Sequence, residues 1–297
     1  MIRKITLDDA QILLRHYAQD HPAHQALVDH AENLGGVYSD GTLRAVWTHW
    51  VDSLHPGLLT FAAAFARDVT DYSRVGVQVL AELMAEAGRM RGLMFADTVP
   101  ASDFGRWLLT QDFRAVMLST ATRLDLQNLQ LPGSVPPQAG QVLTGRAVMR
   151  DDQLAQQFLN LTWQQFDDTQ RAVPIEDYDE ETWSRVVLDR LLTTAPLVLL
   201  QDGTVQAYGL LRRNAAGELL LGWKWAANLD AMRQFLPAVI TFAQNTGAPV
   251  LNGVFASNSE CDQLVWDLLP WQPAPTRNLL VRMNAGLDQD DGKTGRG

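Results

Sequence analysis

Ser39-Asp40-Gly41-Thr42 stands between two runs rich in alternating apolar residues, 34–38 and 43–51. An Asp-Gly pair in this setting is the strongest short-range signal for a β-hairpin, because both turn residues tolerate a positive φ. The same chemistry recurs at Asp202-Gly203-Thr204, between the apolar runs 197–201 and 205–213. The sequence therefore predicts two hairpins of one kind, one in each half of the chain.

Other short patterns repeat in the same order around the two hairpins. Phe95-Ala96-Asp97 is echoed by Phe255-Ala256-Ser257. A period of about 150 residues is too long for a solenoid, whose repeats run to about 20–50 residues. We therefore expect two copies of one domain. The remaining echoes are Leu7-Asp8-Asp9 with Arg150-Asp151-Asp152, and Trp107-Leu108-Leu109 with Trp266-Asp267-Leu268-Leu269.

The composition is that of a globular protein and argues against two classes of partner. The net charge is −10 and no cluster of Lys and Arg occurs, which argues against a nucleic-acid surface. No apolar run is long enough to span a membrane, and the start lacks the apolar core of a signal peptide. A single cysteine, Cys261, cannot form an internal disulfide. We expect a cytoplasmic protein, monomeric or homodimeric.

Each half shows the same order of elements: a strand, helices, a three-strand meander, then helix, strand, helix and strand. This order predicts an α+β fold, a mixed sheet with helices on both faces. We expect Asp8 to cap the first helix, which would run toward Gln19. Strands at 115–124 and 279–283 would close the first and second halves. The expected division is a domain at 1–126, a proline-containing linker at 127–141, a domain at 142–286 and a disordered tail at 287–297.

A meander whose last strand leads into a helix, followed by strand, helix and strand, resembles the GCN5-related N-acetyltransferase (GNAT) superfamily. Two such copies in one chain resemble its tandem members. The resemblance implies acetyl-CoA as co-substrate, with its pyrophosphate on a glycine-containing loop at a helix start, where N–H groups and the helix dipole favour an anion. In the first half this place is Tyr72-Ser73-Arg74-Val75-Gly76-Val77, and in the second Ala227-Asn228-Leu229-Asp230, which has no glycine. The cofactor contacts implied are Ala66, Val69, Arg74, Val75, Gly76 and Val77.

The same resemblance frames the catalytic candidates, Asp68 and Tyr72. Asp68, just after the third meander strand, could act as a general base on an amine, although a solvated loop carboxylate is the commoner role. Tyr72 is a candidate proton donor for the departing thiolate, although a packed loop tyrosine is more common. The tyrosine that the family often carries on its last helix is missing from both 104–109 and 263–267.

Three further features have two interpretations each. The six histidines all lie within the first 55 residues, but no cysteine pair or carboxylate cluster accompanies them, so we expect no metal site. His49 could border the acceptor cleft or be an ordinary sheet histidine. In Trp223-Lys224-Trp225 the tryptophans should share one face, as core or as an apolar pocket. The acidic residues 176–181 suit a helix start or could attract a cationic amine.

Two classes of function remain open. The first is an acetyl-CoA-dependent N-acetyltransferase acting on a small-molecule or peptide amine, with the cofactor in the first half. The second is a catalytically inactive relative that binds coenzyme A or another small molecule, or serves as an interaction protein.

Overall fold

The computed structural model describes residues 1–17, 22–129, 140–169, 178–214 and 217–284. Most of the linker expected at 127–141, and the tail expected at 287–297, lie outside these residues. The described chain forms two units, residues 1–117 with 277–284 and residues 118–169 with 178–276. The domain boundaries at 126 and 142 stay a prediction about the sequence repeat.

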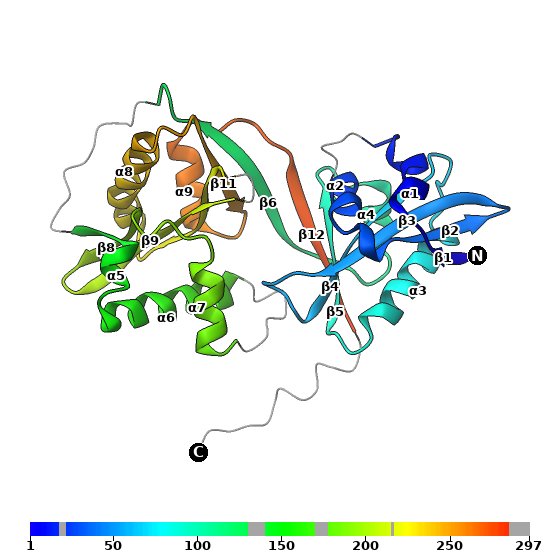
Figure 1. Cartoon of the computed structure of the whole chain (residues 1–297), viewed down its shortest axis with the longest axis horizontal. Coiled ribbons are helices and arrows are strands. Elements are labelled where there is room, and N and C mark those ends of the chain that lie inside the picture. The colour runs from blue at the N-terminus through cyan, green and yellow to red at the C-terminus, as the bar shows by residue number, and fades with distance from the viewer. Residues whose placement is uncertain (18–21, 130–139, 170–177, 215–216, 285–297) are drawn as a thin grey trace, which may run out of the picture. The chain divides into compact units, whose positions relative to one another are not determined.

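The first unit is a mixed sheet with helices on both faces (Figure 1). Its strands lie in the order β1-β2-β3-β4-β5-β12. All neighbours are antiparallel except β4 and β5, which are parallel. The elements are β1 (Ile2–Lys4), α1 (Leu7–Leu14), α2 (Pro22–Asp29), a 3-10 turn (Ala31–Asn33), β2 (Gly35–Ser39), β3 (Thr42–Val51), β4 (Leu58–Phe65), α3 (Val75–Ala87), β5 (Gly92–Thr98), α4 (Asp103–Leu109) and β12 (Thr276–Met283).

The second unit repeats this architecture. Its strands lie in the order β6-β11-β10-β9-β8-β7, and the parallel pair is β10 with β11. Together the two units confirm the predicted α+β class. The elements are β6 (Arg114–Asp125, of which 114–117 cluster with the first unit), β7 (Gln141–Thr144), α5 (Gly145–Val148), α6 (Asp152–Thr169), α7 (Glu180–Leu188), β8 (Pro196–Gln201), β9 (Thr204–Arg213), β10 (Leu219–Ala226), α8 (Leu229–Asn245), β11 (Val250–Ala256) and α9 (Glu260–Leu268).

Both predicted hairpins form with two-residue turns. Asp40 and Gly41 have φ values of 50° and 77°, and Asp202 and Gly203 have 51° and 75°. Two consecutive positive φ values define the turn whose twist matches that of paired strands, and aspartate and glycine reach them at low cost. The turns fix the register of β2 on β3 and of β8 on β9.

The start of α1 differs from the expectation. Thr6, not Asp8, is the N-cap, and it forms a capping box with Asp9: the Thr6 hydroxyl accepts from the Asp9 N–H at 3.3 Å and Asp9 accepts from the Thr6 N–H at 3.0 Å. The helix ends at Leu14, and Gln19 lies outside the described residues.

The last strand of each repeat pairs with the other copy, which the sequence did not predict. Residues 119–125 of β6 pair with Val250–Ala256 of β11, and β12 pairs with β5 from Arg277↔Thr98 to Met283↔Gly92. The strands predicted at 115–124 and 279–283 do form, but each pairs within the unit built mainly from the other half of the sequence. Both strands have similar alternating patterns, so no local signal specified the partner.

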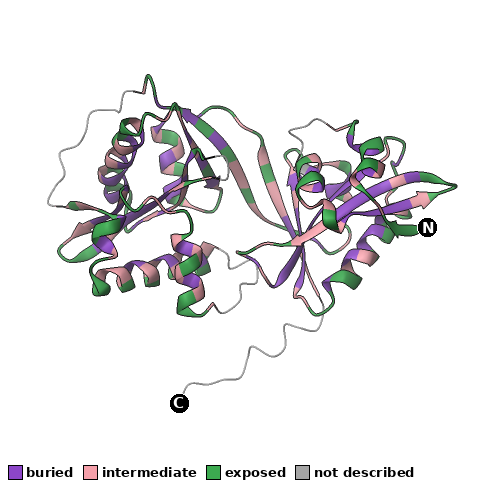
Figure 2. Cartoon of the chain, in the orientation of Figure 1, coloured by how far each residue is buried: buried purple, intermediate pink, exposed green. Residues whose placement is uncertain are grey.

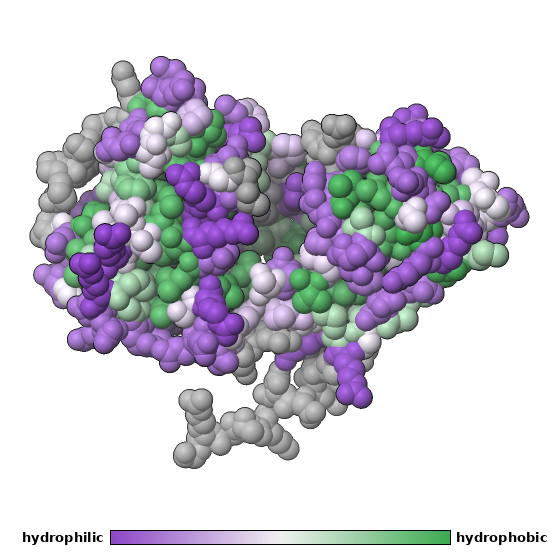
Figure 3. Space-filling view, viewed as in Figure 1, coloured by the Kyte–Doolittle hydropathy of each residue, from purple (hydrophilic) through white to green (hydrophobic). Residues whose placement is uncertain are grey.

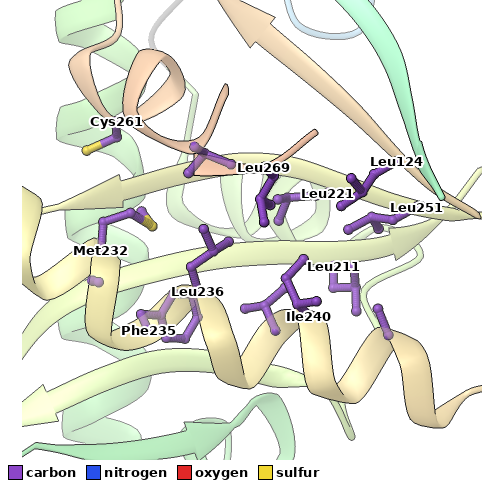
Figure 4. Packing of buried hydrophobic residues seen from close by; sticks show 14 of the residues in the cluster. Leu124, Leu211, Leu221, Met232, Phe235, Leu236, Ile240, Leu251, Cys261 and Leu269 are labelled. Atoms are coloured by element: carbon purple, nitrogen blue, oxygen red, sulfur yellow. The ribbon is translucent and has the colours of Figure 1, made fainter. Parts of the chain in front are cut away.

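Two apolar clusters sandwich the sheet of the first unit. Phe61, Ala63 and Phe65 of β4 pack with α3 and α4, whereas Ala64 packs with α1 and α2. Because β4 is covered on both sides, all eight of its residues are buried (Figure 2). In the second unit, Phe235, Leu236 and Ile240 of α8 pack against strand residues such as Leu211, Leu221 and Leu251 (Figure 4).

Much of the visible face of both units is hydrophilic (Figure 3). Within the described residues, none of the helices combines the length and hydropathy that crossing a membrane requires.

Candidate active site

The parallel strands β4 and β5 pair over only four residues, and the first unit has its pocket beyond that point. Pairing runs from Leu58↔Gly92 to Phe61↔Phe95, while both strands continue to Phe65 and Thr98. A pocket of about 250 Å³ opens where pairing ends. Its lining includes Ala62, Ala63 and Phe65 from β4 and Ala96, Asp97 and Thr98 from β5. Two strands that separate leave backbone groups and small side chains around the gap, where an extended ligand arm can enter.

The pocket receives side chains from both faces of the sheet. Alternation along β4 places Phe61, Ala63 and Phe65 toward α3 and α4, and Thr60 and Ala62 toward α1 and α2. The pocket therefore has two compartments joined at the strand gap. On the α3/α4 side the further lining residues are Tyr72, Phe95, Asp97, Ser102, Asp103 and Phe104, and on the α1/α2 side they are Ala23, Ala26, Trp50, Ala96, Thr98 and Arg277, with Tyr17 lining it as well.

The start of α3 offers unpaired backbone donors beside the first compartment. The N–H groups of Arg74, Val75 and Gly76 have no acceptor among the described residues, as expected for a first helical turn without a side-chain cap. Arg74 is exposed and makes no ion pair with another described residue. A helix start with free N–H groups and a cation is suited to a phosphate.

Three of the six predicted cofactor positions already use their N–H groups within the protein. Ala66 donates to the Arg44 carbonyl at 2.9 Å, Val69 to the Ala66 carbonyl at 2.9 Å and Val77 to the Tyr72 carbonyl at 3.2 Å. These three positions have no donor left for a ligand, so only Arg74, Val75 and Gly76 keep one. The assignment of all six stays a prediction.

Gly76 allows close packing at the start of α3. A Cβ at this position would lie 2.9 Å from the Tyr72 Cβ and 3.1 Å from the Trp107 ring. The glycine lets α3 approach the aromatic cluster of Phe65, Tyr72, Phe104 and Trp107, whose neighbouring ring centroids lie 4.6–6.0 Å apart.

Tyr72, the predicted proton donor, is one of the residues that line the pocket. Burial, followed by the negative charge of Asp103, raises its pKa to about 12. Its hydroxyl donates no hydrogen bond to another described residue, so it is neutral and available near neutral pH.

Asp68 is placed differently from a pocket base. Its exposed carboxylate accepts a hydrogen bond from Arg44 Nη1 at 2.9 Å, which lowers the pKa of that carboxyl, and it does not line the pocket. Its role as a general base stays a prediction that this geometry does not support.

Of the residues that line the pocket, the sequence identified Tyr72 as a site residue and missed the others, among which Trp50, Thr60, Asp97 and Arg277 bear on the chemistry. Asp97 is 3% exposed and accepts the Ser102 N–H at 3.1 Å. Thr60 is 5% exposed, and its Oγ1 has no hydrogen-bond partner among the described residues. Arg277 comes from β12, so only the exchange of strands brings it here. Trp50 lies opposite Thr60 on the antiparallel strands β3 and β4, and the predicted meander could have indicated that these two residues are neighbours.

The sequence matches no protein-family model and no curated protein. Among solved structures, the chain is similar to a GCN5-related N-acetyltransferase from Sphaerobacter thermophilus at 14% identity, with 95% of each chain covered and a TM-score of 0.62. The chain has the GNAT fold. An acetyltransferase of the GNAT family from Colwellia psychrerythraea (13% identity, 96% of this chain and 100% of that one covered, TM-score 0.46) and a tandem GNAT protein of the clavulanic acid biosynthesis pathway (11%, 95% and 98%, 0.47) are more distant.

In the second GNAT-like unit an ion pair occupies the corresponding gap between β10 and β11. Parallel pairing ends at Leu221↔Gly253. Beyond it, Lys224 Nζ lies 2.6 Å from Asp262 Oδ1 and donates to the Val254 carbonyl at 2.9 Å. Asp262 Oδ2 accepts the Ala256 N–H at 2.7 Å. The pair thus uses backbone groups of β11 that would otherwise be open to a ligand.

The two gaps differ in the residue at one equivalent strand position. Counted from the Asp-Gly turns, Trp47 of β3 corresponds to Gly209 of β9, and their ladder partners are Ala63 and Lys224. Ala63 lines the pocket of the first unit. At the matching position the second unit carries a lysine whose side chain is 2% exposed.

The start of the helix that follows this gap has two features that disfavour an anion. Asn228 caps α8 by accepting the Ala231 N–H at 2.9 Å, and Asp230 in the first turn pairs with Arg233. A carboxylate and a filled cap oppose phosphate binding. Among the described residues, the two helix starts differ in this side-chain cap and in the carboxylate of Asp230, and the pocket described above lies beside the start of α3.

The remaining sequence features belong to the packing of the two units. Trp223 packs on Phe166 and Trp183, and Trp225 on Tyr208, so both tryptophans fill the face away from Lys224. Asp179 caps α7, while Glu176 and Asp177 lie outside the described residues.

His49 does not line the pocket, and burial lowers its pKa. Among the described residues no group of three His, Cys, Asp or Glu side chains is placed to hold a metal, and His21 is outside them.

Proposed function

We propose that the first unit is an acetyl-CoA-dependent N-acyltransferase acting on an amine. The observation that carries this proposal is the pocket at the point where β4 and β5 separate, beside the uncapped start of α3. A parallel strand pair that opens next to a helix N-terminus can accept an extended amide arm and the phosphate group at its end. The GNAT fold also supports this chemistry, and the activity itself has to be argued from the residues of the site.

The residues present fit the two ends of acetyl-CoA to different degrees. Ala62, Ala63 and Ala96 leave space for the acyl end between the strands. The N–H groups of Arg74, Val75 and Gly76, with the Arg74 guanidinium, would hold the pyrophosphate. Since Ala66, Val69 and Val77 have no N–H available, we expect fewer phosphate contacts and an affinity weaker than a full set of donors would give.

Acetyl-CoA supplies an acyl group on a thioester, and the protein's residues would orient it and manage two protons. The amine nitrogen forms a bond to the acyl carbon as the carbon–sulfur bond breaks. Tyr72, neutral below a pKa of about 12, would donate its proton to the departing thiolate. Asp97, the buried carboxylate in the pocket, would take the proton released by the amine and return it to Tyr72 through water.

The alternative is a binding protein without turnover. It is favoured by α4, which presents Phe104 and Trp107 and no tyrosine to the pocket side. Release of free thiol from acetyl-CoA, measured across a panel of amines, separates the two. Turnover that is lost in Tyr72→Phe supports the transferase, and saturable acetyl-CoA binding with no thiol release from any amine supports the binding protein.

A further inference from the structure

The second compartment of the pocket, on the face of α1 and α2, contains one cation without a partner. Arg277 is exposed and makes no hydrogen bond or ion pair with another described residue. The two other charged lining residues are engaged, since Asp103 pairs with Arg106 and Asp97 accepts the Ser102 N–H. An unpaired guanidinium at the mouth of a pocket is suited to a carboxylate, which it can bind through two parallel hydrogen bonds.

Arg277 does not face the start of α3. Leu58, Met94 and Val281 share one apolar cluster, which shows that even-numbered residues of β4 and β5 and odd-numbered residues of β12 lie on the same face. Arg277, opposite Thr98, belongs to that face by alternation. Leu280 packs on the other face with the α3 cluster. The anion for Arg277 is therefore a different group from the pyrophosphate expected at α3.

The same compartment has an apolar wall and one unsatisfied hydroxyl. Ala23, Ala26 and Trp50 line it, and the Trp50 ring stacks on His30 at 4.3 Å, which holds it in place. Thr60 Oγ1 is buried there, and no described residue forms a hydrogen bond with it. A buried polar atom without a hydrogen bond is costly, so a ligand that supplies one gains affinity.

From these observations we infer that the acceptor is a small amine that also carries a carboxylate, an amino acid in chemical class, with the carboxylate on Arg277 and an apolar side chain against Trp50. The inference rests on the proposed function, which places the amine at the strand gap. A pocket of about 250 Å³ is below the usual drug-sized range of about 300–1,000 Å³, which favours a compact acceptor. Because Arg277 reaches the first unit only through β12, the first sequence repeat alone lacks this contact.

The test compares each amino acid with the amine that its decarboxylation gives. The pairs are L-tryptophan with tryptamine, L-phenylalanine with phenethylamine and L-leucine with isoamylamine. Calorimetry measures their binding to the whole chain, with and without acetyl-CoA, and thiol release gives kcat/KM. The wild type should prefer the carboxylated member of at least one pair. Arg277→Gln should weaken that member by about 10- to 100-fold and leave its amine unchanged.

Two further variants separate a charge effect from a structural one. Arg277→Glu should reverse the preference toward the decarboxylated amine. Arg282→Gln is the matched control, since Arg282 lies on the same strand, on the other face and outside the pocket lining. Equal effects of Arg277→Gln on both members of a pair, or wild-type binding of none of the amino acids, would overturn the inference. Amino acid binding without acetyl-CoA binding would refute the proposed function alone.

Discussion

Removing the carboxylate of Asp262 tests whether a buried ion pair with Lys224 fills the gap between β10 and β11 in the second unit. Lys224 and Asp262 have side chains that are 2% and 11% exposed, and their charged atoms lie 2.6 Å apart. Asp262→Ala leaves Lys224 buried with one hydrogen bond of 2.9 Å, to the Val254 carbonyl, and a longer one to Gly222. Breaking a buried ion pair by removing one partner costs about 3–5 kcal/mol, because the remaining charge stays desolvated. We expect a loss of this size in the free energy of unfolding of the second unit.

The cost should depend on pH in a defined direction. Burial lowers the pKa of Lys224, and Asp262 opposes that shift. Without Asp262 the pKa of Lys224 in the folded state falls further below the ordinary lysine value of 10.5. Between that folded pKa and 10.5, the unfolded state therefore binds more protons than the folded state. The stability of Asp262→Ala should therefore rise as pH increases toward 10.5, by at most about 1.4 kcal/mol per pH unit.

Urea unfolding followed by far-ultraviolet circular dichroism measures both effects, with separate transitions fitted if the units unfold independently. The control is Lys224→Met with Asp262→Leu, which removes both charges and keeps the volume. A buried pair replaced in this way is often neutral or stabilising. If Asp262→Ala cost less than about 1 kcal/mol at neutral pH, as an exposed pair would, the account of a buried, gap-filling pair would be wrong.

Three further outcomes follow from the first unit. Tyr72→Phe should lower kcat by about 10²-fold or more with unchanged acetyl-CoA affinity, whereas Asp68→Asn should leave kcat unchanged; equal effects of the two would contradict the assignment of the proton donor. Gly76→Ala should destabilise the first unit by about 1–3 kcal/mol in thermal unfolding, because its Cβ meets Tyr72 at 2.9 Å, and a neutral result would show that α3 can shift. A fragment of residues 1–126 should aggregate or remain unfolded because β5 lacks β12, and appending residues 276–284 through a flexible linker should restore a cooperative transition; a stable, monomeric fragment would contradict the strand exchange.

The local chemistry of the sequence was sufficient for the architecture of each copy. The Asp-Gly turns at Asp40 and Asp202 require positive φ values that few residue pairs supply, and alternating apolar runs specify buried strands. Element order then indicated the GNAT fold. Tyr72, a predicted site residue, lies in the loop between β4 and α3 and lines the pocket.

Contacts between distant residues could not be predicted in this way. β6 and β12 are similar alternating strands, so their exchange depends on pairing free energy between distant segments rather than on local pattern. Arg277 enters the pocket only through that exchange. Lys224 was placed on the correct face by alternation, but its partner Asp262 lies on a helix far along the chain, and nothing near Lys224 specified it.

The most direct test of the central claim is calorimetric titration of the whole chain with acetyl-CoA. The account predicts one site per chain. Ala63→Met, which fills the gap between β4 and β5 without adding a charge, should weaken binding at least about tenfold. Ala85→Met, on the exposed side of α3, is the control and should bind as the wild type does. No heat from the wild type, two sites per chain, or undiminished binding by Ala63→Met would contradict the claim that the first unit alone holds acetyl-CoA.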